Sequence, residues 1–180
     1  MKFTRQHIKD IILCEPTVYQ DSRGSFCESF RSDKFNNFLG REINFIQENE
    51  SISKKDVFRG LHFQRLPEPQ SKLVRVVSGS IIDFAVDLRK ESKTYCHHVK
   101  IRLSESNKKQ LFIPSGFAHG FLSLENNTKV VYKVDNYFNS DLDAGVNFKD
   151  EIFNLSINIF DLKVSDKDLS LPFLDELKNM

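Results

Sequence analysis

The 180-residue sequence lacks several features that would define a class of protein at once. It has no tryptophan and only three cysteines, and its 26 lysines and arginines nearly balance 25 aspartates and glutamates. Because nucleic-acid-binding domains carry a basic excess, this balance predicts no nucleic-acid partner. No apolar run approaches the roughly 20 residues that a membrane span needs, so we expect no membrane partner either.

The cysteines are few and widely spaced. Cys14, Cys27 and Cys96 are odd in number, which predicts neither a disulfide framework nor a zinc knuckle. Reduced thiols are typical of cytosolic proteins. The segment after Met1 is charged and has no apolar core of an export signal. We therefore expect a cytoplasmic protein.

Short alternating segments separated by turn residues dominate the chain. Some ten of them have strand character, whereas only residues 32–39 and 172–177 favour helix. We expect Ser32 to cap the first helix and Gly40 to end it. Residues 72–77 and 81–88, joined by a turn at Gly79, are predicted to form a β-hairpin. The pattern predicts an all-β protein, an antiparallel sandwich or barrel with few short helices.

The segment at residues 57–64 is the most unusual strand, because polar residues interrupt an apolar run. Regular alternation would place Phe58, Gly60, His62 and Gln64 on one face, and Val57, Arg59, Leu61 and Phe63 on the other. Gly60 would leave a gap through which a ligand approaches the backbone near His62. A lone histidine is more often a satisfied core residue, so the functional interpretation depends on what accompanies His62.

A second histidine accompanies it in the segment at residues 113–121. There Phe117, His119 and Phe121 share one strand face. The strand at residues 81–88 has one apolar face and one face that carries Asp83 and Asp87. A small barrel with histidine and phenylalanine on its inward face forms a ligand cavity as readily as a packed core.

A possible metal motif at Cys96-His97-His98 is not convincing. Adjacent residues of a strand point to opposite faces, so His97 and His98 would not converge on one ion. His62 and His119 lack the third histidine and the glutamate of a metal-binding cupin. We expect no metal site.

Several ordered segments resemble signatures of the dTDP-4-dehydrorhamnose 3,5-epimerase family. They are residues 21–30, 59–64, 70–75, 83–89, 113–121, 132–133 and 165–168, followed by Pro172. Together they cover nearly the whole chain in the family's order. The resemblance implies one epimerase domain over residues 1–180, with a cupin-type jelly-roll core at roughly residues 8–160 and a C-terminal segment at residues 161–180. It also implies a homodimer that acts on a nucleotide-linked 4-keto-6-deoxyhexose without metal or organic cofactor.

Epimerisation beside a ketone needs a base, a group that stabilises the enolate oxygen, and an acid on the opposite face. His62 is the expected base, because a neutral imidazole titrates near the working pH. The resemblance implies that Asp168 orients His62. It also implies that Lys72 stabilises the enolate and that Tyr132 returns the proton, although a buried core tyrosine with a satisfied hydroxyl fits the sequence equally well.

The resemblance assigns further residues to substrate binding. They are Arg23, Phe26, Glu28, Gln47, Asn49, Arg59, Asp83, His119 and Phe138. Arg23 and Arg59 would bind the diphosphate with forked hydrogen bonds, although a solvated turn arginine is the commoner role for a residue like Arg23. His119 would pair with Asp83 and contact the sugar or its keto oxygen. Family sites borrow residues from the partner subunit, so dimerisation is expected to be part of function.

The sequence departs from the family pattern at the edge of the expected pocket. Phe138 stands where a tyrosine is expected, and Asp143 and Phe148 stand in place of a glutamate and a tryptophan. Ile159-Phe160 replaces a tryptophan-proline pair. These changes leave the catalytic set intact and are expected to reshape the pocket edge.

Three alternatives stay open at the level of sequence. One is an epimerase that inverts only C3 or only C5, or that takes another nucleotide sugar; Tyr132 favours double inversion. Another is a sugar ketoisomerase on the same fold, for which different residues around the base are expected. The third is a non-catalytic jelly-roll that binds a nucleotide sugar or a protein, which retention of His62, Lys72, Tyr132 and Asp168 argues against.

Overall fold

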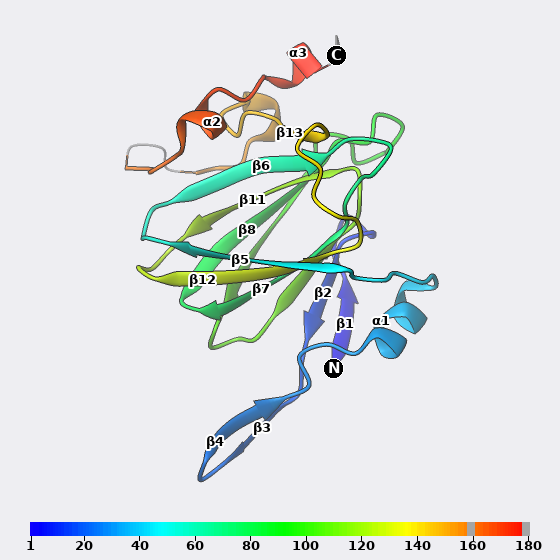
Figure 1. Ribbon diagram of the computed structural model, residues 1–180, viewed down its shortest axis with the longest axis vertical. Coiled ribbons are helices and arrows are strands. Elements are labelled where there is room, and N and C mark those ends of the chain that lie inside the picture. The colour runs from blue at the N-terminus through cyan, green and yellow to red at the C-terminus, as the bar shows by residue number, and fades with distance from the viewer. Residues whose placement is uncertain (158–160, 178–180) are drawn as a thin grey trace.

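The computed structural model describes residues 1–157 and 161–177. The departure noted at Ile159-Phe160 therefore lies outside the described residues. Most of the described strands form two facing antiparallel sheets, and a two-stranded arm projects from them (Figure 1). This arrangement confirms the all-β, antiparallel prediction.

The first sheet has six strands. In spatial order they are β1 (Lys2–Arg5), β2 (Ile12–Glu15), β10 (Gln110–Ile113), β7 (Lys72–Ser78), β12 (Thr128–Val134) and β5 (Gln47–Ser53). The second sheet has five strands. They are β13 (Asp143–Gly145), β6 (Phe58–Gln64), β11 (Phe117–Ser123), β8 (Ser80–Asp87) and β9 (His98–Ser104). The arm consists of β3 (Val18–Asp21) and β4 (Gly24–Cys27).

Three apolar clusters hold these layers together. The first fills the space between the sheets with residues such as Val74 and Val130 from one sheet and Ile81 and Phe121 from the other. The second packs the outer face of the five-stranded sheet against residues that follow β13, and the rings of Phe58 and Phe148 are 4.4 Å apart there. The third lies between the six-stranded sheet and α1 (Ser32–Leu39). The outer faces of both sheets are thus partly covered, while β5 and β12 keep a solvent-facing row of ion pairs such as Lys133–Glu48.

Helix is confined to short pieces. Within α1, Ser32 is the first helical residue and not the predicted cap, because Arg31 occupies the cap position without a side-chain hydrogen bond. Gly40 ends the helix in a left-handed conformation, as predicted. After β13 the chain forms η1 (Glu151–Phe153), and the C-terminal segment contains α2 (Asp166–Leu169) and α3 (Leu174–Leu177); of these three only α3 was predicted. No described helix is long and apolar enough to cross a membrane.

The predicted hairpin of β7 and β8 is wrong. The two strands follow each other in sequence, yet β7 pairs with β10 and β12 while β8 pairs with β9 and β11 in the opposite sheet. Residues of both strands, including Val76 and Ile81, share the inner cluster, so the strands bury their apolar faces against each other instead of lying edge to edge. Gly79 makes the crossing with a φ of +77°, against Thr128.

The strands β11 and β12 also follow each other in the sequence without pairing in a sheet. The connection through Asn126 and Asn127 crosses from the five-stranded to the six-stranded sheet. Tyr132 therefore does not lie on the strand next to His119, although consecutive strands joined by a short turn are usually neighbours. Tyr132 belongs to the sheet that faces His119 across the interior.

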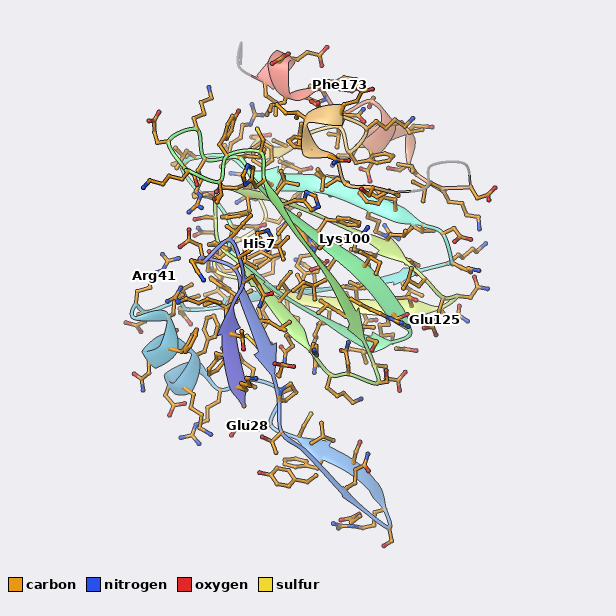
Figure 2. All side chains as sticks on the ribbon, turned by 180° about the vertical axis from the view of Figure 1, so that it is seen from behind. His7, Glu28, Arg41, Lys100, Glu125 and Phe173 are labelled. Carbon is orange, nitrogen blue, oxygen red and sulfur yellow. The ribbon has the colours of Figure 1, made fainter. Side chains whose placement is uncertain are left out.

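The arm stands apart from the barrel. Figure 2 shows β3 and β4 extending beyond the labelled Glu28, on the side away from the C-terminal helices. Tyr19 and Phe26 are directly paired across the arm, and their side chains are 63% and 70% exposed. The arm thus exposes two large aromatic side chains, which is unusual for residues of this type.

Candidate active site

The strand β6 does not alternate regularly, and Gly60 is the reason. Cross-strand partners share a face, and β6 pairs His62 with His119 but Arg59 with Phe121, with a register shift between the two pairs. Phe121 belongs to the inner cluster, whereas Phe58 packs in the outer one. The predicted faces are thus right for Leu61, His62 and Phe63 but wrong before the register shift. Arg59 lies on the inner side with His62, and Phe58 lies outside.

The space beside Gly60 is filled by protein and not open to a ligand, which corrects the second expectation for this strand. A Cβ added at Gly60 would lie 2.6 Å from Cα of Gly120 and 2.7 Å from the carbonyl oxygen of His119. Gly60 also has a φ of +123°, which a residue with a side chain rarely adopts. The two glycines let β6 and β11 approach closely and turn both His62 and Arg59 inward.

His62 pairs with Asp168 as the resemblance implied. Nε2 of the imidazole lies 2.8 Å from Oδ1 of Asp168, and the other carboxylate oxygen accepts the backbone N–H of Gly60 at 3.0 Å. The carboxylate is buried, while 32% of the His62 side chain stays exposed. No other hydrogen bond to the His62 ring is described, so its second ring nitrogen is left to act as a general base.

The carboxylate of Asp168 is fixed by its own helix. Asp168 lies in the first turn of α2, whose cap Ser165 accepts the Asp168 backbone N–H at 3.2 Å. Burial alone would raise the pKa of Asp168, but the hydrogen bonds from His62 and Gly60 outweigh it and lower the pKa below its usual value. Asp168 therefore stays negative and stabilises a protonated His62. Ser165 was part of a recognised motif, but its capping role was not predicted.

A second histidine–carboxylate pair lies beside the first. Nε2 of His119 is 2.7 Å from Oδ1 of Asp83, and both side chains are buried. The other carboxylate oxygen of Asp83 is buried without a described hydrogen-bond partner. Since His119 pairs with His62 across the strands, two imidazoles lie side by side on the inner face of the five-stranded sheet.

Lys72 and Tyr132 face this pair from the six-stranded sheet. Nζ of Lys72 lies 3.4 Å from the carbonyl oxygen of His62 and 6.0 Å from the ring centroid of Tyr132. Burial lowers the pKa of Lys72 to about 8, although the nearby charges of Asp143 and Asp83 oppose the shift. Burial raises the pKa of Tyr132, so its hydroxyl keeps its proton and can donate it.

Polar side chains of β5 line the same interior. Asn49 is the cross-strand partner of Tyr132, and Gln47 donates to Oδ1 of Asn49 at 2.8 Å. The backbone N–H of Phe138 donates to Oε1 of Gln47 at 2.9 Å. Arg59 reaches the same strand, with Nε 3.1 Å from the Ser53 hydroxyl. Gln47, Asn49, Arg59 and Phe138 are thus brought to one side of the barrel.

Three expected binding residues lie elsewhere. Arg23, on the arm, forms an exposed ion pair with Asp21 at 2.6 Å. Phe26 is exposed on the arm, and Glu28 pairs with Lys34 beside α1 at 3.2 Å. Within one chain the described structure does not bring Arg23, Phe26 or Glu28 to the barrel interior.

Among the described residues, no three histidine, cysteine, aspartate or glutamate side chains converge as metal ligands would. Each interior histidine instead contacts a carboxylate. Gln64, also on β6, is buried and hydrogen-bonded at the barrel mouth, and sequence reasoning gave it no role. Its place two residues after His62 on the same strand was the signal that could have found it.

Comparison with known proteins gives one family. The model of the dTDP-4-dehydrorhamnose 3,5-epimerase family matches residues 5–176. The enzyme of that name from Salmonella typhimurium is 43% identical over 170 residues, which cover 94% of this chain and 93% of that protein.

Solved structures agree. The dTDP-4-dehydrorhamnose 3,5-epimerase of Elizabethkingia anophelis matches with a TM-score of 0.93 at 38% identity, covering 98% of this chain and 97% of that one. The dTDP-6-deoxy-D-glucose-3,5-epimerase of Legionella pneumophila, crystallised in complex with dTDP-4-keto-L-rhamnose, matches with a TM-score of 0.92 at 35% identity, covering 97% and 93%. These matches confirm the cupin-type fold and the predicted resemblance. The chain therefore belongs to the dTDP-4-dehydrorhamnose 3,5-epimerase family, a family of isomerases.

Proposed function

We propose that this protein converts dTDP-4-dehydro-6-deoxy-D-glucose to dTDP-4-dehydro-L-rhamnose by inverting C3 and C5. One observation carries the proposal: a carboxylate-bound His62 lies on one sheet, and Tyr132 lies on the sheet opposite. A base and an acid on facing sheets suit removal of a proton from one face of a sugar and return to the other. The sugar nucleotide in the Legionella relative supports this choice of substrate.

Each step uses a group of this chain. His62 takes the proton from the carbon beside the C4 ketone, and Asp168 offsets the positive charge that the imidazole acquires. Lys72, largely protonated below its pKa of about 8, stabilises the enolate oxygen. The hydroxyl of Tyr132 then protonates the carbon from the far side. The ketone itself accepts the electrons, so the reaction needs no metal or organic cofactor.

The same proposal assigns the remaining polar residues to the substrate. The His119–Asp83 pair contacts the sugar beside its keto oxygen, and Arg59 binds the diphosphate. Phe138 stacks on the base, near Gln47 and Asn49. Three contacts support these assignments: His119 pairs with His62, Asn49 pairs with Tyr132, and Gln47 links Asn49 to Phe138.

We further propose that the enzyme is a homodimer, in which the arm of one chain supplies Arg23, Phe26 and Glu28 to the barrel of its partner. The exposed aromatic face of the arm supports this arrangement, since a partner barrel would bury it. A single epimerase domain over residues 1–180 and a cytoplasmic location, suggested by three cysteines that form no described disulfide, complete the proposal.

Product analysis tests the proposed reaction. The protein is incubated with dTDP-4-dehydro-6-deoxy-D-glucose, with and without a chelator, and proton couplings around the sugar ring are read by NMR. We expect the couplings of an L-configured product in both samples. Recovery of unchanged substrate, or inversion at only one carbon, would contradict double epimerisation. A variant with Asp166→Asn, an exposed neighbour of Asp168 on α2, serves as a control that should retain activity.

A further inference from the structure

The loop after β12 carries Phe138 at the barrel mouth. Its ring is 57% exposed, so apolar packing within the described chain does not by itself fix it. Instead, side chains from the two opposite sheets hold the segment through hydrogen bonds to the backbone of residues 137–139. How the loop is held therefore decides where the ring lies.

Gln64, the last residue of β6, forms hydrogen bonds with both neighbours of Phe138. Its Oε1 accepts the backbone N–H of Asn139 at 3.0 Å, and its Nε2 donates to the carbonyl oxygen of Tyr137 at 3.0 Å. The same Nε2 donates to the carbonyl oxygen of Glu68 at 2.5 Å. Gln64 is only 6% exposed, so each of these bonds is largely shielded from water.

Gln47 holds Phe138 itself, which lies between Tyr137 and Asn139. It accepts the Phe138 N–H from β5, in the other sheet, while Gln64 bonds to both neighbours of Phe138 from β6. Three consecutive residues are thus fixed by two glutamines that reach across the barrel mouth. Nothing in the reaction itself requires a buried amide at Gln64, which makes no described bond to His62, Lys72 or Tyr132.

We propose that Gln64 is a positioning residue, which acts through Phe138 to set the affinity for the nucleobase of the substrate. This inference rests on the proposed function, because it takes the ring of Phe138 as the surface on which the base stacks. Gln64 touches no substrate atom in this account. Gln64 affects the affinity for the nucleobase only by fixing the position of residues 137–139.

A double-mutant cycle measures that dependence. The probe is dTDP, and its dissociation constant is measured by calorimetry for the wild type, Gln64→Met, Phe138→Ala and the double variant. We expect Gln64→Met to raise the dissociation constant of dTDP about tenfold, which is the effect of losing one ordered base stack. In the Phe138→Ala background the same change should have no further effect. Equal weakening in both backgrounds would overturn the proposal.

Matched variants separate positioning from general damage. Gln70→Met removes one bond to the same loop, from Nε2 to the carbonyl oxygen of Asn136, but leaves both neighbours of Phe138 held. It should change dTDP affinity less than twofold. Gln64→Glu keeps an acceptor for the Asn139 N–H and loses both donors, so it should fall between wild type and Gln64→Met. Inorganic pyrophosphate should bind all these variants equally, because none of these residues is assigned to the diphosphate.

Hydrogen exchange of the ligand-free protein provides an independent measurement. In Gln64→Met the amide of Asn139 should exchange at least tenfold faster than in wild type, while amides of β11 stay unchanged. Unchanged exchange at Asn139 would show that Gln64 does not hold the segment. A wild-type protein that fails to bind dTDP would instead contradict the proposed function, and with it the role of Phe138.

Discussion

Lys72 and Asp168 show how burial acts differently on two charged residues of one site. Burial of Asp168 is outweighed by two hydrogen bonds, so its carboxylate stays charged. Lys72 has only a 3.4 Å contact with the carbonyl oxygen of His62, and burial therefore lowers its pKa to about 8. The residue expected to carry positive charge toward the enolate is thus the one that loses its proton at mildly alkaline pH.

This difference predicts the alkaline limb of the pH–rate profile. Above about pH 8 Lys72 becomes neutral and no longer offsets the enolate charge, so kcat/KM should fall as pH rises through that value. The profile is measured from pH 6 to pH 10. Lys72→Arg should move the fall to higher pH, because a guanidinium keeps its charge. A wild-type profile that stays flat to pH 10 would contradict a charged Lys72 in the transition state.

At the scale of elements, the close contact of β6 and β11 turns His62 toward Asp168. Gly60→Ala adds a methyl group 2.6 Å from Gly120, at a positive φ. We expect a loss of about 2–4 kcal/mol in unfolding free energy and a fall of more than tenfold in kcat. Gly40→Ala also has a positive φ but meets nothing within 4 Å, and it should cost about 1 kcal/mol with kcat unchanged.

Urea unfolding and steady-state kinetics on the two glycine variants test this contact. If Gly60→Ala and Gly40→Ala lost the same stability, strain alone would explain the effect, and the contact with Gly120 would have no measurable part.

The loop after β8 depends on one buried carboxylate. Asp87 accepts hydrogen bonds from Arg89, Ser92 and Thr94, and Nε of Arg89 lies 2.8 Å from its Oδ1. Burial raises the pKa of Asp87, but these bonds outweigh it and lower the pKa to about 2. Because its pKa is lower in the folded than in the unfolded state, Asp87 stabilises the protein at pH values above its ordinary pKa of about 4. This stabilisation is lost as pH falls toward 2.

Asp87→Asn therefore predicts a pH-dependent difference in stability. At pH 7 the variant should be less stable than wild type by at least about 2 kcal/mol, and the gap should narrow as pH falls from 4 to 2. Chemical denaturation at pH 7, 4 and 3 measures it. A gap that stays constant over this range would show that Asp87 has the same pKa in the folded and unfolded states.

The sequence predicted which segments form strands better than it predicted which strands lie next to each other. Alternation of apolar residues identified most strands, because the period of two is a local property. It could not show that β7 and β8 lie in opposite sheets, since Val76 and Ile81 bury equally well in either arrangement. It also failed at Gly60, where contact with Gly120, 60 residues away, breaks the alternation. The one-turn helix α2 is too short for a helical period to reveal.

The two histidine–carboxylate pairs were named from the family resemblance and not from the alternation of apolar residues. Residues 62 and 168 are far apart in sequence, and their 2.8 Å contact depends on where the C-terminal segment returns to the barrel. The structure adds that His62 and Tyr132 lie on opposite sheets, which alternation alone cannot give. Gln64 escaped notice because its partners are backbone groups of a distant loop.

At the scale of the whole molecule, the proposed dimer predicts complementation between inactive variants. Arg23→Ala should disable the arm, and His62→Ala should disable the barrel. In a mixed dimer, the barrel that keeps His62 receives the intact arm of its partner, so one site is complete. Unfolding and refolding an equal mixture should restore about a quarter of wild-type activity, since about half the dimers are mixed. No recovery despite mixed dimers would place Arg23 and His62 in the same chain's site.

The most direct test of the account is the fate of solvent hydrogen. In deuterated water with dTDP-4-dehydro-6-deoxy-D-glucose, NMR reports deuterium at C3 and C5 for wild type, His62→Ala and Tyr132→Phe. We expect both carbons to be labelled by wild type and neither by His62→Ala, with His62→Ala still folded by circular dichroism. Tyr132→Phe should still remove protons but fail to invert C5. Near-normal labelling by His62→Ala would contradict the assignment of His62 as the base.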